Sequence, residues 1–190
     1  DGYTVATLQS MLNEIVLTRQ TTEASLNMVN AATELTDIEF ATMLLERFKA
    51  AEDENYKIHS GLEVSGKITM LQDLNDRYEA LDPDGQAAVR AKIIAKRPDG
   101  GFTRSQATTD ALAAALTEVE DEQAAAVEAA LTAINGVVAG DNYGQNERKA
   151  MRSALEENAA ILGIDLTEYN KITVDGRKDA VGWDLLANRP

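Results

Sequence analysis

The sequence contains no cysteine, only three prolines and few aromatic residues, which make up 5% of its 190 positions. The absence of thiols excludes a disulfide framework and thiolate metal sites. Alanine and leucine dominate the hydrophobic residues, and such side chains suit long packed helices. A deep ligand pocket usually recruits more aromatic lining, so the composition argues against a small-molecule enzyme.

Positive charge and long apolar runs are scarce as well. The chain has 18 basic and 32 acidic residues, which gives a formal net charge of −14. This acidic excess is present in both halves and would repel phosphate backbones and anionic lipid headgroups, so we expect no nucleic-acid partner. No apolar run approaches the length of a membrane span, so we expect no membrane insertion either.

Sequence signatures of catalysis are also absent. His59 is the only histidine, and the chain has no His-Glu-x-x-His, no Gly-x-Gly-x-x-Gly and no phosphate-binding loop. Asp82 and Asp84 begin a segment that resembles a calcium loop, but its later acidic ligands are missing and helix capping explains both residues. The sequence therefore predicts no catalytic, cofactor-binding or metal-binding residues and no enzyme, and it leaves calcium open as a ligand of the acidic surface.

What the sequence does contain is a pattern that occurs twice. Each half begins with Gly-aromatic-Thr, at Gly2-Tyr3-Thr4 and Gly101-Phe102-Thr103, and ends with Arg-Pro, at Arg97-Pro98 and Arg189-Pro190. Between these ends an aliphatic series and an asparagine recur: Leu8, Leu12, Ile15, Leu26, Val29 and Asn30 correspond to Leu112, Leu116, Val119, Leu131, Ile134 and Asn135. Repetition of this kind indicates a tandem array. We predict two modules, residues 1–98 and 99–190, each large enough to form its own core.

The spacing of apolar residues predicts about four helices in each module. The first is the longest and forms the spine of its module, at residues 4–29 and 105–134. The other helices are expected at 37–50, 65–80 and 86–96 in the first module, and at 146–158, 165–171 and 177–188 in the second. The predicted fold class is therefore all-α, with two tandem helical-bundle repeats.

Several of these helices have a predicted inward face. On the helix at 146–158 this face is formed by Ala150, Met151, Ala154 and Leu155. The inward residues are Ile38, Ala41, Leu44, Leu45 and Phe48 on the second helix, Ile68, Leu71, Leu74 and Tyr78 on the third, and Val181 and Leu185 on the last. Trp183 lies off that last stripe, so it could anchor a partner or a sugar ring, or pack against a neighbouring helix.

Residues 51–66 have no full counterpart in the second half. Their polarity alternates around Ser60-Gly61, so this insertion could form a small hairpin near residues 56–64 or an irregular loop.

The junction between the modules is the most constrained segment. Proline stops the preceding helix, two glycines permit unusual backbone angles, the aromatic residue supplies an apolar plug and the threonine can cap the next helix. The residues of this inter-module joint are Arg97, Pro98, Gly100, Gly101, Phe102 and Thr103. We predict a docked, directional joint that sets the rise and twist of an array.

Several segments carry a resemblance to a known type of protein: residues 29–32, 151–156 and 162–166, Tyr169-Asn170, and the closing helices up to Arg97-Pro98 and Arg189-Pro190. They resemble the alanine-rich all-helical tandem modules of Gram-positive cell-surface and S-layer-type proteins. The resemblance implies an extracellular location at the cell wall or cell surface, and it brings no catalytic residues. It also implies that the partners are neighbouring repeats of the same protein, other cell-surface proteins or glycans.

Two functional hypotheses follow. The first is a non-enzymatic structural or spacer module pair of a secreted or wall-attached bacterial surface protein, contributing to extension, assembly or adhesion. The alternative is a glycan- or protein-binding module that uses the loops at 51–66 and 136–145 and could be appended to a polysaccharide-degrading enzyme.

Overall fold

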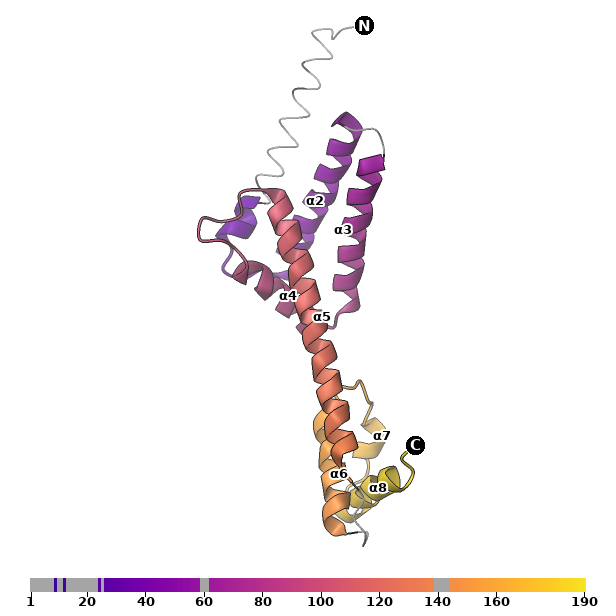
Figure 1. Ribbon diagram of the computed structural model, residues 1–190. Coiled ribbons are helices and arrows are strands. Elements are labelled where there is room, and N and C mark those ends of the chain that lie inside the picture. Colours follow the sequence, from indigo (N-terminus) through magenta and orange to yellow (C-terminus); the bar gives the residue numbers. More distant parts are fainter. Residues whose placement is uncertain (1–8, 10–11, 13–23, 25, 59–61, 139–143) are drawn as a thin grey trace. The chain divides into compact units, whose positions relative to one another are not determined.

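A computed structural model of the protein describes residues 9, 12, 24, 26–58, 62–138 and 144–190, and this part of the chain is all-helical, without strands (Figure 1). The helices are α2 (Asp37–Ile58), α3 (Leu62–Ala80), α4 (Pro83–Ala95), α5 (Ser105–Gly136), α6 (Gln145–Asn158), α7 (Thr167–Asn170) and α8 (Asp175–Ala187). The predicted all-α class is confirmed. Residues 26–31 are also helical, whereas most of the spine predicted for residues 4–29 lies outside the described residues.

The chain divides into two compact units, residues 1–119 (unit 1) and 120–190 (unit 2), with the division inside α5. The first turns of α5 belong to unit 1 because their apolar face is buried there. Side-chain contacts also join these turns to each earlier helix: Arg47 to Thr109, Arg77 to Thr117, and Lys96 and Lys92 to Glu118. The two units are defined by packing and do not test the modules 1–98 and 99–190, which were predicted from sequence repetition. Those modules stay a prediction.

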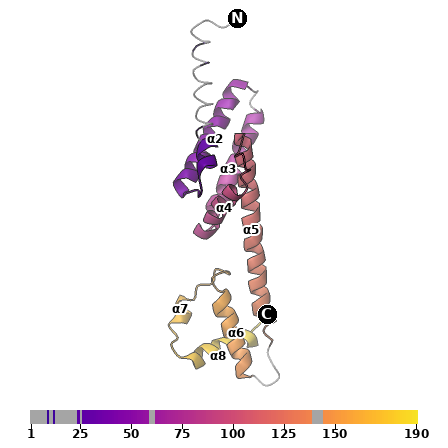
Figure 2. The same cartoon turned by 90° about the vertical axis from the view of Figure 1, so that its left-hand side faces the viewer.

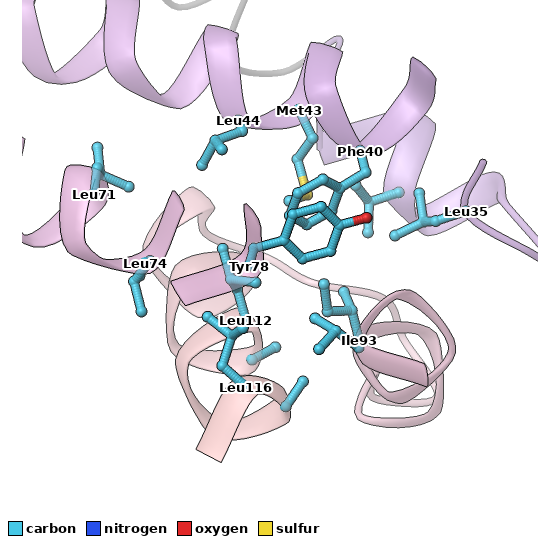
Figure 3. Packing of buried hydrophobic residues seen from close by; sticks show 14 of the residues in the cluster. Leu35, Phe40, Met43, Leu44, Leu71, Leu74, Tyr78, Ile93, Leu112 and Leu116 are labelled. Atoms are coloured by element: carbon cyan, nitrogen blue, oxygen red, sulfur yellow. The ribbon is translucent and has the colours of Figure 1, made fainter. Parts of the chain in front are cut away.

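The core of unit 1 is built from α2, α3, α4 and the start of α5 (Figure 3). Tyr78 stacks on Phe40 with ring centroids 4.1 Å apart. The predicted inward residues Leu71, Leu74 and Tyr78 of α3 are buried, as are Val89 and Ile93 of α4. Burial of this apolar surface is the main stabilising term of the unit.

The predicted inward face of α2 is wrong by part of a turn. Leu44 is buried as predicted, but Ile38 and Leu45 are 80% and 55% exposed, and Phe40 and Met43, which were not predicted, are buried. Both sets have helical spacing, so periodicity alone could not choose between them. The larger aromatic ring of Phe40, which stacks within the core, fixes the rotation of the helix.

The insertion at 51–66 is neither a hairpin nor a loop over the residues that the structure describes. α2 continues to Ile58 and α3 begins at Leu62, and the two helices lie side by side (Figure 1). His59 and Ser60-Gly61 lie outside the described residues. A two-stranded hairpin is marginal without a sheet to support it, whereas both flanking helices are already held by the core.

Unit 2 is organised around the crossing of α6 and α8 (Figure 2). Gly182 lies at this crossing, where an added Cβ would be 2.5 Å from the carbonyl oxygen of Arg148. The buried residues of α8 are Gly182 and Leu186, and Leu185 is 40% exposed. The predicted face at Val181 and Leu185 is therefore wrong by one residue, because close approach of the helix backbones selects the glycine.

The apolar stripe predicted along the long first helix of each module is buried only in part. On α5 it is buried up to Val119, whereas Leu131 is 46% exposed. In the first half Val29 is fully buried, but Leu12 is 52% exposed.

Candidate functional site: the joint around Arg97

Arg97 lies just after α4 and connects the end of that helix to the end of the helical segment 26–31. Its Nη1 donates to the main-chain carbonyls of Val29, Asn30 and Ala32, at 2.9, 2.8 and 2.7 Å. The helical segment 26–31 ends here, and the last carbonyls of a helix have no partner within the helix. A guanidinium satisfies these acceptors and places positive charge at the negative end of the helix dipole.

The side chain of Asn30 holds the segment that leads into α5. Its Oδ1 accepts from the main-chain N–H of Phe102 at 2.7 Å, and its Nδ2 donates to the carbonyl of the same residue at 2.9 Å. Phe102 is 4% exposed and belongs to the core of unit 1. The aromatic residue is thus held by both its backbone and its ring.

Gly101 is constrained in two ways, and Gly100 in neither. Gly101 has φ +77°, and an added Cβ would lie 2.8 Å from Cγ of Asn30. Its N–H donates to the Pro98 carbonyl at 2.8 Å, which closes a tight turn. Nothing lies within 4 Å of a Cβ added at Gly100. Of the two glycines predicted to provide unusual backbone angles, only Gly101 does so.

The start of α5 lies slightly beyond the position predicted for its cap. Thr103 is exposed, and the helix begins two residues later at Ser105. The first turn closes through a bond from the N–H of Ala107 to the carbonyl of Arg104.

Arg189 makes the same set of contacts in unit 2. Its guanidinium donates to the carbonyls of Ile134, Asn135 and Val137, at 3.1, 3.1 and 2.8 Å. The acceptors precede Arg97 by 68, 67 and 65 residues and Arg189 by 55, 54 and 52 residues, a constant difference of 13. The 51–66 insertion lies within the longer of these two intervals.

A cluster of charged groups joins α6, α7 and α8 in unit 2. Arg152 contacts Glu156, Asp175 and Asp179 at 3.0, 2.9 and 3.3 Å. Tyr169 donates its hydroxyl proton to Glu156 at 2.7 Å. This hydrogen bond, followed by Arg152, lowers the pKa of Glu156, while burial and then the carboxylate raise the pKa of Tyr169 to about 12. The groups compensate one another and hold the short α7 against its neighbours.

Of the two roles considered for Trp183, the structure shows packing against a neighbouring helix. It is half-buried on α8, with the guanidinium of Arg148 lying 5.3 Å from its ring centre. The contact joins α8 to α6 and includes a cation–π component.

The described residues offer less evidence for a ligand pocket, a metal site or a membrane span. Unit 1 has an open groove of about 430 Å³ whose lining includes Phe40, Leu45, Tyr78 and Gln86. Within the described part of the chain, no group of three or more His, Cys, Asp or Glu side chains is placed to hold a metal ion. No helix in that part is long and apolar enough to cross a membrane.

Comparison with protein-family models, curated proteins and solved structures finds no match for this chain. The site therefore has to be interpreted from its own geometry. Sequence reasoning identified Arg97, Gly101 and Phe102 but missed the role of the Asn30 side chain. The available signal was the recurrence of asparagine after the aliphatic series, at Asn30 and Asn135.

Proposed function

We propose that the protein is a non-enzymatic pair of tandem helical modules that serves as a spacer or assembly element of a secreted or wall-attached surface protein. The observation that carries this proposal is that Arg97 and Arg189 each donate to three main-chain carbonyls at corresponding sequence positions. A matched set of long-range contacts at matched sequence positions is typical of duplicated modules.

The joint in unit 1 has the properties that a connection between modules needs. Arg97 ties the last helix of the first module to the end of its first helical segment, and Asn30 in turn holds Phe102 of the second module. The connection is therefore made by specific hydrogen bonds and a buried ring, in contrast to a glycine-rich linker that samples many conformations.

Arrays of one, two and three copies of the chain test the spacer function. The maximum particle dimension, measured by small-angle X-ray scattering, should grow by a nearly constant increment for each copy. An Asn30→Ala and Gly101→Ala double variant should broaden the distance distribution, whereas Gly100→Ala should leave it unchanged. Arrays that collapse into compact globules would contradict the proposal.

The proposed location is tested separately. Antibodies against this chain should label intact cells of the source organism, and brief protease treatment of those cells should remove the label. Labelling that requires permeabilised cells would contradict a surface location.

A binding module remains the second candidate, favoured by the open groove of unit 1 and by the exposed Ile38 and Leu45 of α2. A glycan array and a pull-down with wall fragments would test it. Specific binding that is abolished by Leu45→Glu and retained in Leu185→Glu, an exposed leucine of unit 2, would favour this candidate.

A further inference from the structure

The end of α5 repeats the acceptor side of the joint, but no described residue bonds to the side chain of its asparagine. Asn135 follows Ile134 as Asn30 follows Val29, and its carbonyl bonds to Arg189 as that of Asn30 bonds to Arg97. Asn30 is half-buried and makes two hydrogen bonds to Phe102. Asn135 is exposed, and its side chain has no hydrogen bond to any described residue.

The apolar residues beside the two asparagines also differ in exposure: they are more exposed beside Asn135 than beside Asn30. Val29 is fully buried and Leu26 is half-buried against the core that contains Phe102. Their counterparts Ile134 and Leu131 are half-buried and 46% exposed. The second site thus exposes aliphatic side chains whose counterparts in the first site lie in or against the core that contains Phe102.

We infer that Asn135, with Leu131 and Ile134, forms a docking site for the Gly-aromatic segment at the start of another copy of the module. Within this chain that segment is Gly2-Tyr3, which matches Gly101-Phe102 in the tandem pattern. The asparagine would accept from the tyrosine N–H and donate to its carbonyl, while the ring would cover the two aliphatic side chains.

The glycine before the aromatic residue is part of the recognition. At the occupied site a Cβ on Gly101 would collide with the Asn30 amide. A segment with any other residue at that position would have to displace the asparagine amide and adopt a left-handed backbone conformation. The inference rests on the proposed tandem arrangement and names the partner of the Asn135 site.

A two-copy chain tests the inference. In this two-copy chain an Asp-Gly link replaces Asp1 and joins Pro190 of the first copy to Gly2 of the second, which reproduces the spacing from Pro98 to Phe102. Hydrogen exchange measured by mass spectrometry should show the Tyr3 amide of the second copy exchanging at least about tenfold more slowly in the unsubstituted two-copy chain than in its Asn135→Ala variant. Asn135→Ala in the first copy should remove this protection, and Asn135→Asp, which keeps only the acceptor, should remove part of it.

Phe102 provides the internal reference in the same experiment. Its amide should be protected in both copies, and Asn30→Ala should release it without affecting Tyr3 of the second copy. Protection of Phe102 without protection of that Tyr3 would overturn the docking site and leave the proposed function standing. Loss of protection at both amides in the unsubstituted chain would overturn the joint itself. Circular dichroism of each variant verifies that the helices are retained.

Discussion

Two adjacent glycines at the joint have different requirements, which makes them a matched pair for substitution. Gly101→Ala forces a side chain into a left-handed conformation and against Asn30. We expect unit 1 to lose about 1–3 kcal/mol of unfolding free energy. Gly100→Ala meets nothing and should change the stability by less than about 0.5 kcal/mol. Urea denaturation followed by far-UV circular dichroism distinguishes these outcomes, and equal effects would contradict the geometry.

Arg97 and Arg189 make corresponding contacts in different surroundings. The bonds of Arg97 are partly buried and those of Arg189 are exposed to solvent. Arg97→Ala should therefore destabilise unit 1 by about 1.5–3 kcal/mol, because it leaves partly buried carbonyls unpaired. Arg189→Ala should cost unit 2 less than about 1 kcal/mol, since water replaces the lost donors. Chemical denaturation of both variants measures the difference, and a larger effect at Arg189 would count against this account.

The stability of unit 2 should depend on pH through Glu156. Its pKa in the folded chain lies below the ordinary value near 4.5, mainly because Tyr169 donates a hydrogen bond to the carboxylate. The unfolded chain therefore binds the proton more readily, so this contribution is complete above pH 4.5 and is lost as the pH falls towards the folded pKa.

Denaturation followed by Trp183 fluorescence at about pH 7 and about pH 3 measures this loss. Glu156→Gln should reduce the pH dependence, whereas Glu157→Gln at the neighbouring exposed position should retain it. An unchanged pH dependence in Glu156→Gln would show that other carboxylates are responsible.

At the level of single residues, sequence reasoning predicted those whose role follows from backbone chemistry. Pro98 ends α4 and Asp82 caps it, accepting from the N–H of Gly85 at 2.7 Å. Side-chain roles that depend on distant partners were not accessible. The bonds from Asn30 to Phe102 span 72 residues, and no local pattern specifies such a pairing.

At the level of elements, Gly182 sets the distance between α6 and α8. Gly182→Ala would place a Cβ 2.5 Å from a main-chain oxygen, which cannot move without shifting α6. We expect a loss of about 1–3 kcal/mol in unit 2 and a change in Trp183 fluorescence. Gly176→Ala is the control, because nothing lies within 4 Å of its added Cβ. A neutral Gly182→Ala would mean that the helices do not approach as closely as described.

Helix ends were predicted well where the sequence marks them. α3 was expected to end at residue 80 and α6 at 158, as they do, and the residues that follow break the apolar pattern. The extension of α2 to Ile58 was missed, because its polar alternation indicates a strand when considered alone. The start of α2 at Asp37 was predicted correctly, but the residue that caps it is the preceding Thr36. Thr36 and Glu39 form a reciprocal capping box there, with the Thr36 N–H donating to the Glu39 carboxylate at 2.9 Å.

At the level of the whole molecule, the two units differ in the size of their cores. Unit 1 buries a large cluster of aliphatic and aromatic side chains, whereas the described buried hydrophobic residues of unit 2 are Ala130, Met151, Ala159 and Leu186. Hydrophobic stabilisation scales with the buried apolar area, so unit 2 should unfold first. Trp183 fluorescence should therefore change at lower urea than the final far-UV circular dichroism transition. Coincident transitions would show that α5 couples the units into one cooperative structure.

The division between these units could not be predicted from repetition. A sequence repeat identifies equivalent residues, but α5 buries Leu112 and Leu116 in unit 1 although both follow the predicted boundary at 98/99. Packing places the boundary where apolar contacts become sparse, which depends on three-dimensional neighbours that composition and periodicity do not contain.

The contacts of Arg97 also determine how the chain would respond to tension. A stretching force that enters at Pro98 reaches the adjacent guanidinium before it reaches the hydrophobic interior. Because one nitrogen lies against three carbonyls, these attachments would be strained together and would have to rupture in a single event. The joint would therefore act as a mechanical stop that shields the first module from being peeled apart one turn at a time.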